Sequence, residues 1–132
     1  MIEYSNEKKI SAEELSRVFK LSGINRPVDD LDRLKTMIDN ASIIWTAWDN
    51  KKLIGVARAL TDFSYACYLS DLAVVEDHQK QGIGNTLVEK LHSQIGPDVS
   101  LLLLAAPSAL NYYPKLHFEN ITTAFLKKRR SF

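Results

Sequence analysis

Gln79-Lys80-Gln81-Gly82-Ile83-Gly84 joins an apolar, strand-like run to an amphipathic helical pattern. The run before it, residues 68–75, is rich in residues that favour strands. After it, apolar residues recur at helical spacing: Ile83, Leu87, Val88, Leu91 and Ile95. A helix start has four backbone N–H groups without internal partners and carries partial positive charge, and glycine lets a bulky group approach that backbone. The stretch therefore predicts a site for a phosphate or pyrophosphate.

Two widespread phosphate-binding motifs do not match this stretch. A P-loop requires Gly-Lys-Ser/Thr after four intervening residues, and the chain has none. The dinucleotide fingerprint requires a third glycine, where this chain has Leu87. The remaining pattern is Gln-x-x-Gly-x-Gly. A glycine-rich turn that only caps a helix would have the same pattern, so both interpretations stay open at this point.

Composition limits the classes of function. A length of 132 residues suits one domain, residues 1–132, with a core of its own. The net charge of +1 gives no bulk electrostatic reason to bind nucleic acid or an anionic membrane. The chain opens on a strand-like segment rather than a signal peptide, and its longest apolar stretch, residues 101–107, is far too short to span a membrane.

Cysteine and histidine usage adds two expectations. The single cysteine, Cys67, cannot form an internal disulfide, which fits a reducing, cytoplasmic setting and a buried structural thiol. His78, His92 and His117 lack the spacing of metal ligands, so no metal is expected. The sequence is also compatible with a homodimer.

The pattern of elements predicts an α/β (α+β) fold. Ser11 and Glu14 form a capping box that starts a helix ending at Gly23, and a second helix is expected from Pro27. Strands are expected at residues 2–5, 43–48, 53–60, 65–75 and 100–105, helices at 82–95 and 109–116, and one or two final strands within 118–128. The order β-α-α-β-β-β-α-β-α-β implies a mixed, mostly antiparallel sheet with helices on both faces.

Three segments in the right order resemble the GCN5-related N-acetyltransferase (GNAT) superfamily. The glycine loop resembles that family's coenzyme A pyrophosphate loop, Arg/Gln-x-x-Gly-x-Gly/Ala. Residues 72–79 resemble its strand four, and residues 112–118 (YYPKLHF) resemble its Phe/Tyr-Tyr-x-Lys-Leu-Gly-Phe signature. Two departures stand out: His117 replaces the usual glycine, and Ala106 replaces an asparagine that contacts the pantetheine arm in many members. Residues 21–27 and 55–62 have a weaker likeness to plastid-type serotonin or arylalkylamine N-acetyltransferases and their bacterial relatives.

The resemblance implies acetyl-CoA as cosubstrate and a set of residues that bind it. The pyrophosphate would be bound by the backbone of Gln79, Lys80, Gln81, Gly82, Ile83 and Gly84, with side-chain bonds from Asn85 and Thr86. The pantetheine arm would pair with Leu72, Ala73 and Val74. A bulge in that strand would free N–H groups near Ala73–Val74 to polarise the thioester carbonyl.

The resemblance also assigns the acid and suggests the base. Tyr113 matches the family tyrosine that protonates the leaving thiolate, whereas Tyr112 is expected to pack. Asp71 and Glu76 flank the strand and are the candidates for a carboxylate that accepts the amine proton through water. The implied activity is acetyl transfer to a primary amine of a small molecule by direct attack in a ternary complex. A non-catalytic acyl-CoA-binding or interaction module and a protein or peptide N-acetyltransferase remain as alternatives.

The expected acceptor wall is short and lacks an acidic cluster. It would consist of residues 23–30 together with aromatic side chains near residues 63–68. Such a wall favours an acceptor with one amine and an apolar or aromatic body over a polycation.

Overall fold

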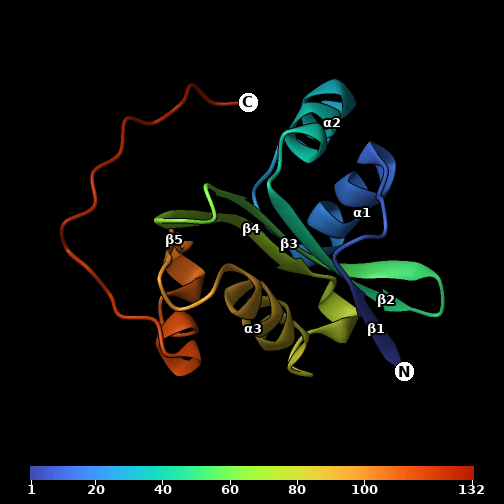
Figure 1. Cartoon of the computed structure of the whole chain (residues 1–132). Helices are drawn as coiled ribbons and strands as arrows, with labels where there is room; N and C mark the ends of the chain where they lie inside the picture. Colours follow the sequence, from blue (N-terminus) through green and yellow to red (C-terminus); the bar gives the residue numbers. More distant parts are fainter.

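Five strands form one mixed sheet in the computed structural model, which describes residues 1–132 (Figure 1). They are β1 (Ile2–Ser5), β2 (Ile43–Asp49), β3 (Lys52–Thr61), β4 (Ala66–Val74) and β5 (Ser100–Leu103), and their order in the sheet is the order in the sequence. The first four strands pair antiparallel, and only β4 and β5 are parallel. The predicted α/β class and the mostly antiparallel sheet are therefore confirmed.

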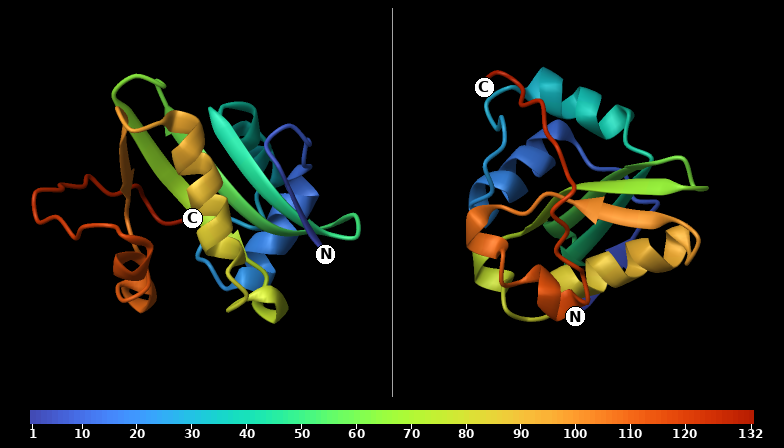
Figure 2. Two further views of the ribbon diagram at one scale, coloured as in Figure 1. Left: turned by 60° about the horizontal axis from the view of Figure 1, so that its bottom comes forward. Right: turned by 90° about the vertical axis from the view of Figure 1, so that its left-hand side faces the viewer.

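Helices cover both faces of this sheet, as predicted. Helices α1 (Ala12–Ser22) and α2 (Leu31–Asp39) lie on one face, and α3 (Ile83–Ile95) lies on the other (Figures 1 and 2). The capping box is present, with Ser11 and Glu14 each accepting from the other's backbone N–H, and Gly23 ends α1 at φ 84°.

The second helix begins later than predicted. Its N-cap is Asp30, whose carboxylate accepts from the N–H of Arg33, and helical residues start at Leu31 rather than Pro27. Pro27 instead begins a turn, in which its carbonyl accepts from the N–H of Asp30 at 3.1 Å. This turn closes a connecting loop, residues 23–30, that lies against the sheet beside the site described below.

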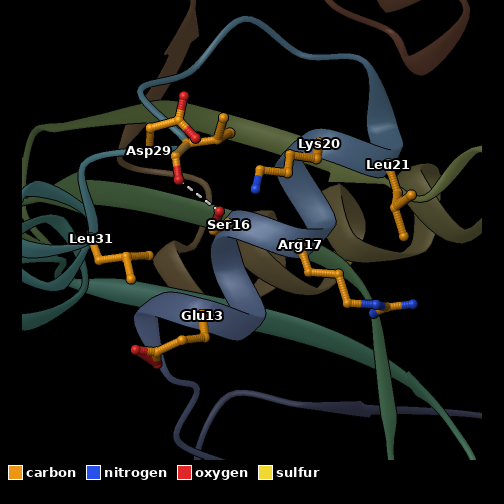
Figure 3. Close-up of a pocket in the computed structure, with 8 residues that line it drawn as sticks. Glu13, Ser16, Arg17, Lys20, Leu21, Asp29 and Leu31 are labelled. Atoms are coloured by element: carbon orange, nitrogen blue, oxygen red, sulfur yellow. Dashed lines mark hydrogen bonds between the residues drawn. The ribbon is translucent and has the colours of Figure 1, made fainter.

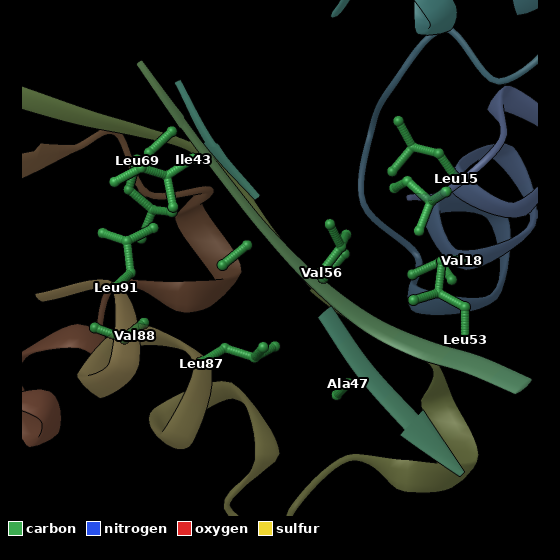
Figure 4. Close-up of a cluster of buried hydrophobic side chains, with 14 of the residues drawn as sticks. Leu15, Val18, Ile43, Ala47, Leu53, Val56, Leu69, Leu87, Val88 and Leu91 are labelled. Carbon is green, nitrogen blue, oxygen red and sulfur yellow. The ribbon is translucent and has the colours of Figure 1, made fainter. Parts of the chain in front are cut away.

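The apolar core has one half on each face of the sheet. Leu15 and Val18 of α1 pack on one face, and Leu87, Val88 and Leu91 of α3 pack on the other (Figure 4). All five are at most 4% exposed, because both helices turn an apolar stripe toward the strands. Cys67 is buried in this core as predicted, and its burial raises the pKa of the thiol.

The C-terminal quarter differs from the sequence prediction. The expected helix at 109–116 is two short 3-10 turns, Pro107–Ala109 and Tyr113–Leu116. The expected strands within 118–128 are absent, and the tail instead forms an irregular arc away from the body that returns to end near α2 (Figure 1). Apolar residues of the tail are exposed, including Phe125 at 97%. Strand propensity alone does not form a strand, because the segment pairs with no neighbouring strand.

Helix length and hydropathy bear on membrane insertion. No helix combines the length and the apolar character required to cross a bilayer.

Candidate active site

Strands β4 and β5 separate partway along β4. Their parallel pairing covers Ala66–Leu69 opposite Ser100–Leu103, but β4 continues to Val74. The side of β4 that faces β5 is thus an open strand edge over residues 70–74. An extended ligand can pair with such an edge.

A β-bulge marks the point of separation. Opposite β3, Arg58 pairs with Asp71 and Ala59 pairs with Leu69, so Ser70 is an extra residue in β4. The resemblance places a bulge near Ala73–Val74, and the structure places it at Ser70 instead. The reason is the register with β3, which stays regular from Asp71 to Val74.

The open edge presents alternate N–H groups. The N–H of Val75 donates to the carbonyl of Ile54 on β3 at 2.9 Å. Because strand residues alternate, Ala73 also points its N–H toward β3, whereas Leu72 and Val74 point theirs toward the opening. Two of the three predicted pantetheine-binding residues therefore have the required orientation, and the Ala73 N–H faces β3.

The predicted pyrophosphate loop lies at the end of this edge. Lys80 and Gly82 adopt left-handed conformations, with φ 65° and φ 80°, and Gly82 is the N-cap of α3. None of the six backbone N–H groups of residues 80–85 has an acceptor within the protein. Free N–H groups beside the positive end of α3 form the arrangement that binds phosphate.

The side chains of this loop are already partly engaged. Gln79 Nε2 donates to the carbonyl of Val74 at 2.8 Å and so covers the end of the open edge. Thr86 donates its hydroxyl to Gly82 at 3.0 Å, and Asn85 donates one amide hydrogen to Glu89 at 3.1 Å. Lys80 and Gln81 are exposed, and Ile83 is buried in the core. The backbone rather than these side chains supplies the free donors.

Tyr112 lies over the start of α3. A Cβ added to Gly84 would stand 2.7 Å from the Tyr112 hydroxyl, so glycine leaves the space that this phenol occupies. The sequence predicts only packing for Tyr112. The structure adds a hydroxyl beside the loop, which the pattern of the signature does not reveal.

Tyr113 lies between two aromatic rings. Its ring contacts those of Tyr112 and Phe118 edge-on, with centroids 5.2 Å and 5.6 Å away. Burial raises the pKa of the Tyr113 phenol, and the charge of Arg26 partly opposes this increase. The Tyr113 hydroxyl makes no hydrogen bond within the protein, so its proton is free for a ligand. His117, where the family has glycine, keeps the left-handed turn after it at φ 69°.

Asp71 is an ion-pair partner rather than an available base. Its side chain is 0% exposed, and its two oxygens accept from Arg26 Nε and Arg58 Nε, each at 2.5 Å. Both oxygens are bound by guanidinium groups and the side chain is fully buried, so a proton relay from bulk water does not reach this carboxylate. The structure therefore argues against the predicted role of Asp71 as base. Glu76, the other candidate, is exposed and follows β4 in the 3-10 turn Glu76–His78.

His78 ties this turn to the β2–β3 hairpin. Its Nε2 lies 2.9 Å from Asp49 and its Nδ1 lies 2.7 Å from Asp77. The hydrogen bond to Asp49, followed by that to Asp77, raises the pKa of His78. The pair thus anchors the chain just before the loop.

The ion-pair cluster around Asp71 was only partly visible in the sequence. Arg58 and Asp71 occupy core-facing positions of two strands that the sequence pairs as neighbours, which is a signal for a buried ion pair. Arg26 comes from the loop between the helices, 45 positions away from Asp71, and no local pattern links them.

A separate surface hollow lies away from the β4–β5 opening. Its volume is about 620 Å³. Figure 3 shows the residues that line it, on α1 and the loop leading to α2. Its charged lining mixes both signs, with Glu13, Arg17, Lys20 and Asp29. It includes Val28 and Asp29 of the predicted acceptor wall but none of the predicted catalytic or coenzyme-binding residues. It is an open surface feature apart from the β4–β5 opening.

Comparison with known proteins identifies the family. A family model for the acetyltransferase (GNAT) domain matches residues 5–132. The chain belongs to the GNAT acetyltransferase family. It is an N-acetyltransferase, as the sequence predicts.

Relatives share sequence over different parts of their length. The uncharacterized N-acetyltransferase ycf52 of Pyropia yezoensis is 31% identical over 121 residues, which cover 86% of this chain and 68% of that protein. GCN5-related N-acetyltransferase 2, chloroplastic, of Arabidopsis thaliana is 39% identical over 71 residues, covering 52% of this chain and 28% of that protein. A probable acetyltransferase of meticillin-resistant Staphylococcus aureus has a crystal structure that superposes over 100% of both chains with a TM-score of 0.84 at 20% identity, which shows a shared fold.

Proposed function

We propose that this GNAT enzyme transfers the acetyl group of acetyl-CoA to a primary amine of a small molecule. The observation that carries the proposal is the row of six unpaired N–H groups of residues 80–85, at the end of an open β4 edge. A helix cap without a ligand role would not need a neighbouring strand to remain open on one side.

The residues present fit coenzyme A. Gly82 and Gly84 leave backbone donors accessible for a pyrophosphate, and Leu72 and Val74 offer outward N–H groups to an extended amide chain. Acetyl-CoA, when bound, supplies an activated thioester. No metal is needed for this chemistry, and the enzyme acts on both substrates together rather than through an acetylated side chain.

Two side chains are assigned to proton transfer. Tyr113 donates its phenolic proton to the leaving thiolate, because its hydroxyl is free and its raised pKa keeps it protonated at neutral pH. Glu76 accepts the proton of the amine through water, since it is exposed and Asp71 is not available. Outward N–H groups of β4 near Leu72 polarise the carbonyl.

One assay distinguishes the proposed enzyme from a non-catalytic acyl-CoA-binding module. Release of free thiol from acetyl-CoA is measured with a panel of amines: phenylethylamine, tryptamine, spermidine, an aminoglycoside and a peptide. Amine-dependent thiol release supports an enzyme, and a preference for the small monoamines supports the acceptor class. Coenzyme binding by calorimetry without thiol release for any amine would instead favour a non-catalytic acyl-CoA-binding module, and preference for the peptide would favour a protein acetyltransferase.

The proposal also includes the cellular compartment in which the protein acts. The lone buried thiol of Cys67 suits any reducing compartment supplied with acetyl-CoA. The cytoplasm meets this condition, and so does the plastid, where one relative is named as chloroplastic.

A further inference from the structure

Arg26 is one of three charged side chains, with Arg58 and Asp71, that lie where β4 and β5 separate. Its Nη2 donates to the carbonyl of Ser70 at 2.8 Å, and Ser70 is the bulge residue directly after the last pair with β5. Its Nε donates to Asp71, and its Nη1 donates to the carbonyl of Asn25 at 2.8 Å. Three different contacts therefore fix the orientation of this guanidinium.

The fixed guanidinium has donors to spare. A guanidinium has five N–H groups, and the contacts above use Nε–H and one hydrogen on each terminal nitrogen. The Arg26 side chain is 26% exposed, whereas its neighbour Arg58 is only 7% exposed. Arg26 is thus the member of the cluster that can contact a ligand.

The cluster carries excess positive charge. Two guanidinium groups share the single carboxylate of Asp71, which leaves one net positive charge. This charge acts on the proposed acid as well, because Arg26 lowers the pKa of Tyr113 while burial raises it. A bare ammonium approaching this opening would be repelled, and an acceptor with its own negative group would not.

We infer that Arg26 binds a carboxylate of the acceptor, and that the preferred acceptors are amines carrying a carboxylate, of the amino-acid class. The inference rests on the proposed function and narrows its acceptor. A planar guanidinium with two N–H groups that have no acceptor in the protein, on a side chain that is 26% exposed, matches a carboxylate in shape and charge. Arg26 acts here as a specificity-determining residue.

Matched pairs of acceptors test the inference. Thiol release is compared for L-phenylalanine and 2-phenylethylamine, and for L-tryptophan and tryptamine, since each pair differs by one carboxylate. We expect kcat/KM to be about 10- to 100-fold higher for the carboxylate-bearing member, as for one charge-assisted contact. In Arg26→Met this ratio falls to about one. Arg17→Met, an arginine on α1 that donates to Leu53 instead, keeps the wild-type ratio. Equal rates within each pair, or a ratio unchanged in folded Arg26→Met, would overturn the inference.

A binding measurement tests the role of Arg26 without depending on turnover or on the folding of a variant. Calorimetry compares 3-phenylpropionate with 3-phenyl-1-propanol on the wild-type protein, so it does not depend on the folding of a variant. Tighter binding of the carboxylate supports the inference, and equal or weaker binding refutes it. Absence of thiol release with every amine would refute the proposed function, while this binding comparison would still decide the role of Arg26.

Discussion

Replacing Asp71 by asparagine separates an anchoring role from a role in proton transfer. Asp71→Asn keeps the shape of the side chain but leaves Arg26 and Arg58 facing a neutral amide. Removing one partner of a buried ion pair costs about 3–5 kcal/mol. We expect a cost near the lower end of this range, about 3 kcal/mol. The reason is that Arg26, at 26% exposure, can turn toward water, whereas Arg58, at 7%, cannot.

This free energy corresponds to a large shift in melting temperature. With an unfolding entropy of about 2.1 cal/mol/K per residue, each kcal/mol is worth about 3.6 °C in a chain of 132 residues. The variant should therefore melt about 11 °C below the wild type, which thermal unfolding followed by circular dichroism measures directly.

The control is the other carboxylate, and turnover is the second measurement. Glu76 is exposed and forms no ion pair, so Glu76→Gln should melt within about 2 °C of the wild type, as surface substitutions do. Thiol release per folded molecule should fall in Glu76→Gln. An Asp71→Asn protein that melts like the wild type but has lost turnover would refute the anchoring role and restore Asp71 as the base.

Three further changes test the loop, the acid and the anchor of the loop. Gly84→Val should abolish coenzyme A binding in calorimetry and leave the fold intact, because the only close contact of its Cβ is the hydroxyl end of the exposed Tyr112 side chain, 2.7 Å away; unchanged affinity would contradict the loop assignment. Tyr113→Phe should lower turnover about 100-fold with little change in coenzyme affinity, and wild-type turnover would show that another group supplies the proton. His78→Gln should lower the melting temperature at pH 5–6. Because folding raises the pKa of His78, this difference should shrink as pH rises above that pKa, whereas a constant difference from pH 5 to 9 would exclude the ion pair with Asp49.

Local patterns predicted the elements that depend on neighbouring residues. The capping box at Ser11, the stop at Gly23 and the loop around Gly82 each follow from residues within a few positions of one another. The bulge at Ser70 could not be predicted, because it arises from the register between two strands. The bonds of Arg26 to Asp71 and Ser70 were missed for the same reason, since they join parts of the chain that only the fold brings together.

The C-terminal segment shows the limit of strand propensity. Residues 118–128 contain strand-favouring residues, yet a strand forms only where a partner supplies the ladder. The two glycines of the loop are not equally suitable for testing the phosphate site. Gly82 has a φ of 80°, which strains any side chain placed there, so Gly84 is the position at which to test the site.

Because the parallel ladder between β4 and β5 is short, β5 should open more easily than the rest of the sheet. Four residues of β5 hold the chain that leads to Tyr113, whereas β3 is paired along both sides. Amide protons of β5 should thus exchange with solvent through openings that leave β2 and β3 protected. Because the chain that follows β5 carries Tyr113, the proposed acid, we expect such openings to lower the catalytically competent fraction without unfolding the protein, so that activity depends on the local closing equilibrium of β5 as well as on global stability.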